Sequence, residues 1–380
     1  MRLFENLTIN WLGKRKFFYI LSTSLFVIGW VSVAVRGFHF GIDFKGGTEI
    51  VLEFQKPVNI SQIRGYVANI GLGAVELKTF GSKTGVLVRT ELQKIPPKIY
   101  PKVVKNINNA IEKIYPSLNY SIVDSSKLSS VTYALSNHDT TNALINKLYK
   151  AGFQTGKVSE ELSNKQMIVS VSIAEWIKDN LKQKLKDNPF KVVKEDHVGP
   201  KVGKELERDA IIAVFLSLLA ILIYLAFRFK FIFAFGAVLA LFHDTLITLG
   251  LYAVLYGVIP GLNLEINLTV VAAFLTLIGY SINDTVIVFD RVREMMKIHK
   301  TMPLLEVINL SVNKTMSRTL LTGGTTLLTV TVLLIFGGEV LRAFAFTLFF
   351  GIIIGTYSSI FVASAIVLEY ANKTKKKVQF

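Results

Sequence analysis

The chain has 380 residues, of which 51% are hydrophobic, and its formal net charge is +16. This apolar composition lies outside the usual soluble range and indicates long uncharged segments. Because many basic residues flank such segments, the charge does not favour nucleic-acid binding. The sequence has no cysteine, which excludes disulfides and thiolate metal sites.

Six segments come close to the roughly 20 apolar residues that a helix needs to cross a bilayer. The spans are expected at residues 17–35, 210–227, 231–256, 267–289, 317–336 and 343–368. No small-residue cleavage site follows the first span, so it is predicted to be a retained anchor. Four apolar residues recur at helical spacing before it: Leu3, Phe4, Leu7 and Trp11. Residues 1–36 therefore favour an interfacial helix and the first span, with a disordered start as the alternative.

Positive charges in the short loops fall on one side of the predicted membrane. They lie at Lys14–Lys16, after the second and fourth spans, and in a basic tail at 373–380. In the short loops on the opposite side, 257–266 and 337–342, Arg342 is the only Lys or Arg residue. Because short cytoplasmic loops are rich in Lys and Arg, both termini are predicted to be cytoplasmic.

Residues 37–205 are predicted to form an exported domain, and residues 206–372 hold the second to sixth spans. Residues 48–54 alternate apolar and polar side chains, as a half-buried strand does. Further strands are expected at 74–80, 84–90, 119–123, 129–135, 166–173 and 190–196, and helices at 60–70, 98–114, 139–151 and 174–187. This mixture predicts α+β layers in which helices cover one face of a mainly antiparallel sheet.

Two glycine-rich motifs flank the exported domain. The first, GIDFKGG, is predicted to be a tight turn next to the membrane, because closely spaced glycines permit unusual backbone conformations. The second, HVGPKVGKEL, precedes the second span and is interpreted as a return hinge. The predicted hinge residues are Gly41, Asp43, Gly46, Gly47, Gly199, Pro200 and Gly203.

Asp284 lies inside the apolar fourth span, where a carboxylate is costly and is a functional candidate by default. Arg318 lies about one helical turn inside the fifth span, so antiparallel neighbours would bring the two to similar depth. Asn283, Thr285 and Thr322 could form hydrogen bonds nearby. A snorkelling arginine and a structural aspartate are the alternative, but together these residues favour a proton-titrating pair.

A second polar couple, His243 and Asp244, lies near the middle of the third span. A proton relay and a structural bond between helices both remain open for it. In the sixth span, Gly351 and Gly355 are four residues apart and indicate a closely packed helix face.

Three motifs, GIDFKGG, HVGPKVGKEL and GYSINDTVIVFDRVRE, occur in the order found in the SecF branch of the SecD/SecF protein-export family, which the chain resembles. SecD proteins typically carry Asp-Ala-Asn-Val and Phe-Glu-Arg in the fourth span. This chain has Asn283–Val286 and Phe289–Arg291 instead, which favours SecF. The resemblance implies an α-helical membrane protein, with six transmembrane helices as half of the twelve-span arrangement of the resistance-nodulation-division superfamily.

The resemblance also implies a role in proton-driven export of preproteins across the bacterial cytoplasmic membrane. Asp284 and Arg318 match the aspartate and arginine of the family's proposed proton path. The implied partners are SecD, the SecYEG channel, YajC, translocating preproteins and membrane lipid, with protons as coupling ion and no cofactor. The exported segment is longer than is usual in the family, which predicts an insertion within residues 91–165.

Two other functions remain open. A half-transporter of the same superfamily that moves a small molecule or lipid would be expected to show an apolar cleft in the exported domain. A purely structural subunit would tolerate neutralisation of Asp284. An enzyme is not expected, because no nucleophile, base or metal set stands at workable spacing.

Overall fold

The computed structural model describes residues 7–73, 75–92, 94–159, 161, 165–259 and 262–374. The chain divides into two compact units. The membrane unit comprises Met1–Phe44 and Glu205–Phe380, and the sheet unit comprises Lys45–Lys204. The basic tail predicted at 373–380 lies mostly outside the described residues.

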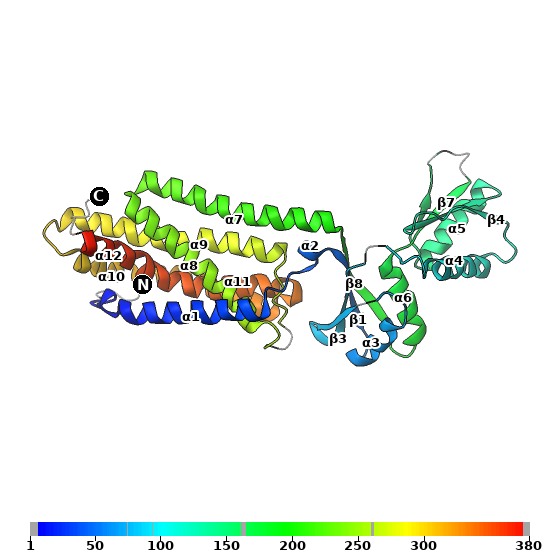
Figure 1. Cartoon of the computed structure of the whole chain (residues 1–380), viewed down its shortest axis with the longest axis horizontal. Coiled ribbons are helices and arrows are strands. Elements are labelled where there is room, and N and C mark those ends of the chain that lie inside the picture. Colours follow the sequence, from blue (N-terminus) through cyan, green and yellow to red (C-terminus); the bar gives the residue numbers. More distant parts are fainter. Residues whose placement is uncertain are drawn as a thin grey trace. The chain divides into compact units, whose positions relative to one another are not determined.

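In the described residues of the membrane unit, six helical segments are long and apolar enough to span a membrane (Figure 1). They are Leu12–Arg36, Pro200–Arg228, Phe231–Leu255, Leu268–Ile298, Leu304–Phe336 and Val340–Thr374. The six predicted spans are therefore confirmed. Several helices are longer than the apolar segments from which they were predicted, for example α10, which begins at Leu304 rather than at residue 317. Polar residues can continue a helix beyond the apolar segment, because the helical hydrogen bonds are made by the backbone.

The elements of the membrane unit are mostly long helices, of which α2 and α7 each have one end in the sheet unit. They are η1 (Leu12–Lys14), α1 (Arg15–Arg36), α2 (Ile42–Lys45), α7 (Pro200–Arg228), α8 (Phe231–Leu255), α9 (Leu268–Ile298), α10 (Leu304–Phe336), α11 (Gly338–Ser358), η2 (Ser359–Ala363) and α12 (Ser364–Thr374). The segment η2 is a π-helical turn within the sixth span. Helix α9 packs against both α10 and α11, and α8 packs against α1 and α11.

The start of the chain differs from the prediction. The proposed interfacial helix falls largely on residues 1–6, outside the described part, and Leu7–Asn10 are not helical. Trp11 instead donates its indole Nε1–H to the Asn313 side chain at 2.7 Å, and the backbone N–H of Leu12 donates to Asn309 at 3.0 Å. These bonds to α10 satisfy the indole N–H of Trp11 and the backbone N–H of Leu12; a longer helix would have satisfied only the second internally.

The sheet unit contains two four-stranded antiparallel sheets, with strand orders β2-β3-β1-β8 and β4-β5-β7-β6. The strands are β1 (Gly47–Phe54), β2 (Glu76–Phe80), β3 (Ser82–Thr90), β4 (Tyr120–Asp124), β5 (Ser130–Leu135), β6 (Thr155–Lys157), β7 (Gln166–Ser170) and β8 (Phe190–Val198). The helices are α3 (Ile60–Ala68), α4 (Tyr100–Ile114), α5 (His138–Lys150) and α6 (Ile173–Lys184). The predicted α+β class is confirmed, whereas the prediction of a single sheet was wrong, because the strands form two sheets.

Strand β1 lies at the centre of the first sheet, between β3 and β8. Ile50, Leu52 and Phe54 are buried on one face, as the alternation predicts. The other face is buried as well, because Val51 is 1% exposed and Glu49 forms an ion pair with Arg89. The strand is therefore buried on both faces rather than one. The proposed insertion within 91–165 stays a prediction; that segment contributes three strands of the second sheet.

Candidate functional site

The first glycine motif does not form a simple turn, because α2 occupies its centre. Gly46 and Gly47 follow with φ of +74° and +118°, a region that favours glycine. A Cβ on Gly47 would clash with the Thr90 carbonyl oxygen, so the close backbone approach also requires glycine. Earlier in the motif, the Asp43 carboxylate accepts the backbone N–H of Leu268 at 2.9 Å, which caps the start of α9.

The second glycine motif leads from β8 into the second span with little irregular chain. Pro200 is the first residue of α7, a position that suits proline, and Gly203 already lies within that helix. A Cβ on Gly46 would lie 3.1 Å from both the Pro200 Cα and the Val198 carbonyl oxygen. The two motifs therefore touch each other, while their role as a hinge stays a prediction.

Asp284 is 2% exposed on α9, deep in the membrane unit. Among the described residues it has no hydrogen bond and no ion pair. Arg318 of α10 acts electrostatically on its carboxylate but is itself exposed and forms no ion pair with it in the described structure. Asp284 and Arg318 therefore interact at longer range than an ion pair, and the buried Asp284 carboxylate has no hydrogen-bond donor in the described structure.

Asn283 and Arg318 belong to an exposed stripe along α9 and α10, which we call the polar face. Its residues share exposure and spacings of three and four: Ala272, Thr276, Gly279 and Asn283 on α9, and Arg318, Thr322, Thr325 and Thr329 on α10. Such spacing places each set on one side of its helix. Tyr280 donates to Thr326 at 3.2 Å and ties the two helices together beside this face. Thr285, in contrast, is fully buried behind it.

Asp244 is 1% exposed and has several partners. Its Oδ2 accepts the hydroxyl groups of Ser281 at 2.7 Å and Ser358 at 2.8 Å, and its Oδ1 lies 2.9 Å from Nδ1 of His243. The structure thus joins the His243–Asp244 couple to α9 and α11. The sequence prediction missed both serines, although hydroxyl groups within apolar spans are a signal for such bonds.

The predicted close packing at Gly351 and Gly355 is present, and α9 is the partner helix. A Cβ on Gly351 would clash with the Leu277 side chain, and one on Gly355 would lie 2.8 Å from the Ser281 hydroxyl. These glycines let α11 approach α9 where Asp244 joins them.

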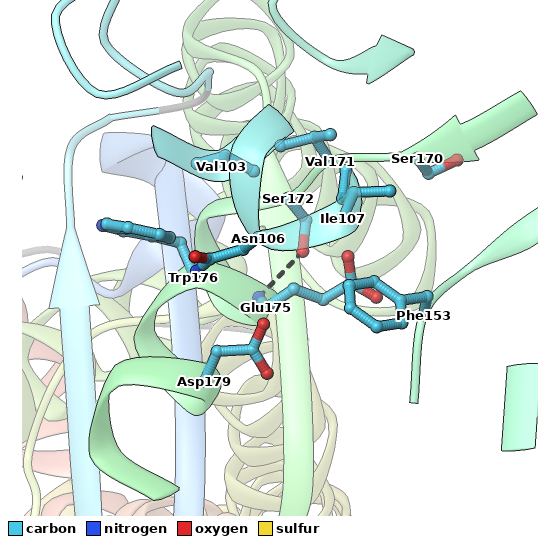
Figure 2. A pocket seen from close by; sticks show the side chains of 10 residues that line it. All are labelled: Val103, Asn106, Ile107, Phe153, Ser170, Val171, Ser172, Glu175, Trp176 and Asp179. Carbon is cyan, nitrogen blue, oxygen red and sulfur yellow. Dashed lines mark hydrogen bonds between the residues drawn. The ribbon is translucent and has the colours of Figure 1, made fainter. Parts of the chain in front are cut away.

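The sheet unit has a small pocket between α4 and α6 (Figure 2). Its volume of about 20 Å³ has room for about one water molecule. Glu175, 8% exposed, accepts the backbone N–H of Gln154 at 3.2 Å, and burial raises its pKa to about 7. Asp179 lies one turn further along α6, and burial raises its pKa as well.

A larger apolar cavity of about 360 Å³ lies among membrane helices, lined by residues such as Phe38, Phe215 and Phe242. The half-transporter hypothesis expected an apolar cleft in the exported domain instead. Among the described residues there is no group of three or more His, Cys, Asp or Glu side chains that could hold a metal ion.

Comparison with known proteins identifies the family. The family described as protein export membrane protein SecD/SecF, C-terminal, matches residues 177–373, and the SecD/SecF GG motif matches residues 31–58. The protein translocase subunit SecF of Rhodothermus marinus is 37% identical over 97% of this chain and 95% of its own length. The chain belongs to the SecF family. The SecF of Koribacter versatilis is 36% identical over 97% of this chain and 93% of its own.

A solved structure agrees with this SecF assignment. SecDF of Thermus thermophilus, described as a translocon-associated membrane protein, is 28% identical, with a TM-score of 0.65. The match covers 98% of this chain and 40% of the SecDF chain, so this chain spans less than half of that protein. The SecF relatives are named as protein translocase subunits, and this chain has six helices long enough to span a membrane. The chain is therefore a multi-pass membrane protein and a transport component in protein export.

Proposed function

We propose that this SecF chain acts with a SecD-like six-span partner to drive preprotein export with the proton-motive force. Its place is the bacterial cytoplasmic membrane, surrounded by lipid, with both termini in the cytoplasm and the sheet unit on the far side. The SecYEG channel and YajC are the proposed further partners, the preprotein is the substrate, and the proton is the coupling ion. The positive charges of the short loops support this orientation.

The observation that carries the proposal is the state of Asp284. A buried carboxylate without donors is costly in either protonation state, and charging it is the more costly. The charge of Arg318 opposes that cost from a distance. A group held between two opposing effects changes its protonation when water access changes, and this is what a proton carrier requires.

The polar face supports the proposed partner. An arginine and several threonines exposed along α9 and α10 would otherwise face lipid hydrocarbon, where a charge is costly. Small and polar residues at spacings of three and four are typical of helix interfaces in membranes. A second six-span half covering this face would bury Arg318 beside Asp284 and complete the proton site.

The mechanism follows from the loss of one charge. When Asp284 takes up a proton, Arg318 loses its attraction to the carboxylate and turns to a partner across the polar face. Helices α9 and α10 then repack, and the change reaches the sheet unit through Gly46, Gly47 and Gly199. A protonation-biased element with two states is the minimum that such a motor needs.

The test uses vesicles that contain the chain and its SecD-like partner, with export measured with and without a proton gradient. Asp284→Asn and Arg318→Met are each expected to abolish the gradient-dependent part. Asp290→Asn is the matched control, because it makes the same chemical change on α9 at an exposed ion pair with Arg228. Parental export by either test variant would mean that Asp284 and Arg318 are structural and that the chain docks a channel without carrying protons.

A further inference from the structure

One carboxylate connects three membrane spans. The Asp244 side chain of α8 receives hydroxyl donors from Ser281 of α9 and Ser358 of α11, at 2.7 and 2.8 Å. All three residues are at most 3% exposed. Hydrogen bonds to an ionised acceptor are about twice as strong as neutral ones, so this point holds the three helices more firmly than ordinary packing does.

The other oxygen of Asp244 is the end of a hydrogen-bonded chain. His243 Nδ1 lies 2.9 Å from Oδ1, the Tyr357 hydroxyl lies 3.5 Å from His243 Nε2, and Ser22 lies 3.2 Å from that hydroxyl. With Asp244 ionised, as the inference below requires, every atom is satisfied when Ser22 donates to Tyr357, Tyr357 donates to Nε2, and Nδ1–H donates to Asp244. The reverse direction of these bonds would require a protonated Asp244, and the infrared measurement below distinguishes the two.

The backbone around Asp244 is adapted to these bonds. A Cβ on Gly355 would lie 2.8 Å from the Ser281 hydroxyl and 3.5 Å from Asp244 Oδ2, so glycine makes room for the contact. Directly after Ser358, the sixth span forms the π-helical turn η2 (Ser359–Ala363). Such turns are rare in α-helices and are frequent at functional sites.

The same bonds reach the candidate proton carrier through α9. Ser281 is three residues before Asp284 and four before Thr285, whose hydroxyl donates to the Ser281 carbonyl oxygen at 3.4 Å. Residues at these spacings lie on one side of a helix. A bond that fixes the rotation of α9 at Ser281 therefore also fixes the position of the Asp284 side chain.

We propose that Asp244 is a positioning residue, an ionised clamp between α8, α9 and α11 that sets the place of Asp284. It does not itself carry the transported proton. In the described part of the chain, the charged and titratable groups that act on the two sites are Arg318 of α10 at Asp284, and His243 of α8 itself and Tyr357 of α11 at Asp244. The inference rests on the proposed role of Asp284.

The test compares Ser281→Ala, Ser358→Ala and Asp244→Asn in vesicles with the partner subunit. The matched control is Ser311→Ala, since Ser311 is also fully buried but donates within its own helix, to Val307 at 2.7 Å. Each clamp variant is expected to shift the pH midpoint of gradient-driven export and to slow export about tenfold, the factor for one hydrogen bond to a charged group. The control is expected to keep the parental pH profile. If Asp244→Asn does not fold, the serine variants decide.

A second measurement does not depend on export. The infrared band of the protonated Asp284 carboxyl group, identified by its loss in Asp284→Asn, should change frequency in both serine variants and stay unchanged in Ser311→Ala. A second acid-induced carboxyl band that disappears in Asp244→Asn would overturn the inference, because Asp244 would then take up a proton itself.

The two proposals fail in different ways. If Asp284→Asn exports as well as the parent, the proposed function is wrong. The infrared band of the Asp284 carboxyl group then decides by itself whether Asp244 positions Asp284. If Asp284→Asn loses export while Ser281→Ala and Ser358→Ala keep the parental pH profile and band, the proton role stands and the clamp is wrong.

Discussion

Asp244 and Asp284 are both almost completely buried in the same helical bundle, yet their surroundings are opposite. Asp244 has two serine hydroxyls and the His243 ring as partners. Asp284 has no hydrogen bond in the described part of the chain. A buried polar group without a partner is costly, whereas a saturated one can stabilise the fold. Burial alone therefore does not separate the two aspartates, whereas the number of donors does, and the proposals above assign the positioning role to the one with donors and the proton to the one without.

Glu175 of the sheet unit lies between these two cases. It is 8% exposed and accepts one backbone N–H, from Gln154. Burial raises its pKa to about 7, against which Lys178 and the single hydrogen bond act only in part. The three buried carboxylates therefore differ in the number of their hydrogen-bond partners: three at Asp244, one at Glu175 and none at Asp284 in the described structure.

The largest effect on stability is expected for Asp244→Asn. The amide keeps one acceptor oxygen and turns an NH₂ group toward donors, so buried groups on α8, α9 and α11 lose their partner. We expect a loss of about 3 kcal/mol in the free energy of unfolding, because each buried donor left without its acceptor costs about 1–3 kcal/mol. Reversible unfolding in detergent micelles measures it. Asp290→Asn, at the exposed ion pair with Arg228, should cost less than about 1 kcal/mol. Equal losses of stability in Asp244→Asn and Asp290→Asn would mean that the buried hydrogen bonds of Asp244 contribute no more than an exposed ion pair.

The next effect is a pH dependence from Glu175. Its folded pKa of about 7 exceeds the ordinary value of 4.5, so the folded state binds more protons between these values. The contribution of Glu175 to stability is therefore complete below pH 4.5 and is lost as the pH rises through about 7, by on the order of 2 kcal/mol. Urea unfolding of residues 45–204 at pH 5 and pH 8 measures the difference.

Glu175→Gln should remove most of this slope, because the amide does not ionise and still accepts from Gln154. The matched control is Asp187→Asn, the loss of an exposed acid in the same unit. A slope that persists in Glu175→Gln and disappears in Asp187→Asn would place the titrating group elsewhere.

The sequence predicted the elements of the fold well, because each depends on local patterns. Apolar length located all six spans, and alternation located β1 and most other strands. Alternation does not show which strands pair. The two sheets arise because β1 pairs with β8, far along the chain, and β5 pairs with β7. The three-residue β6 is too short for a periodic signal.

The candidate site was predicted only in part, for a similar reason. A carboxylate in an apolar span stands out in the sequence, which indicated both Asp244 and Asp284. Which of them receives donors depends on Ser281 and Ser358, two ordinary residues of other helices. Their bonds follow from the packing of α11 on α9 at Gly355, and a single sequence contains no information on that contact.

A smaller effect is expected for Gly355→Ala. The added methyl group would press on Ser281, whose short side chain cannot move far, and overpacking typically costs about 1–3 kcal/mol. Replacing glycine in a helix recovers about 1 kcal/mol, so a net loss of about 1 kcal/mol is expected. Gly324→Ala in α10 is the control, because nothing lies within 4 Å of its Cβ. Equal unfolding midpoints in micelles for the two variants would contradict the tight contact at Asp244.

The smallest effect on stability, and the sharpest difference from Asp244, is expected for Asp284→Asn. No hydrogen bond is broken in the described structure, and a costly buried charge is removed, so the change in unfolding free energy should lie within about 0.5 kcal/mol or favour the variant. Gradient-driven export should nevertheless be lost, because an amide cannot take up and release the proton. Stability in micelles and export in vesicles are measured on the same batch of purified protein, and Asp244→Asn is measured in parallel. A loss of about 3 kcal/mol in Asp284→Asn would mean that Asp284 has structural partners after all and that the two aspartates are alike. A stable variant without export separates them, since only a functional role removes activity and leaves the fold intact.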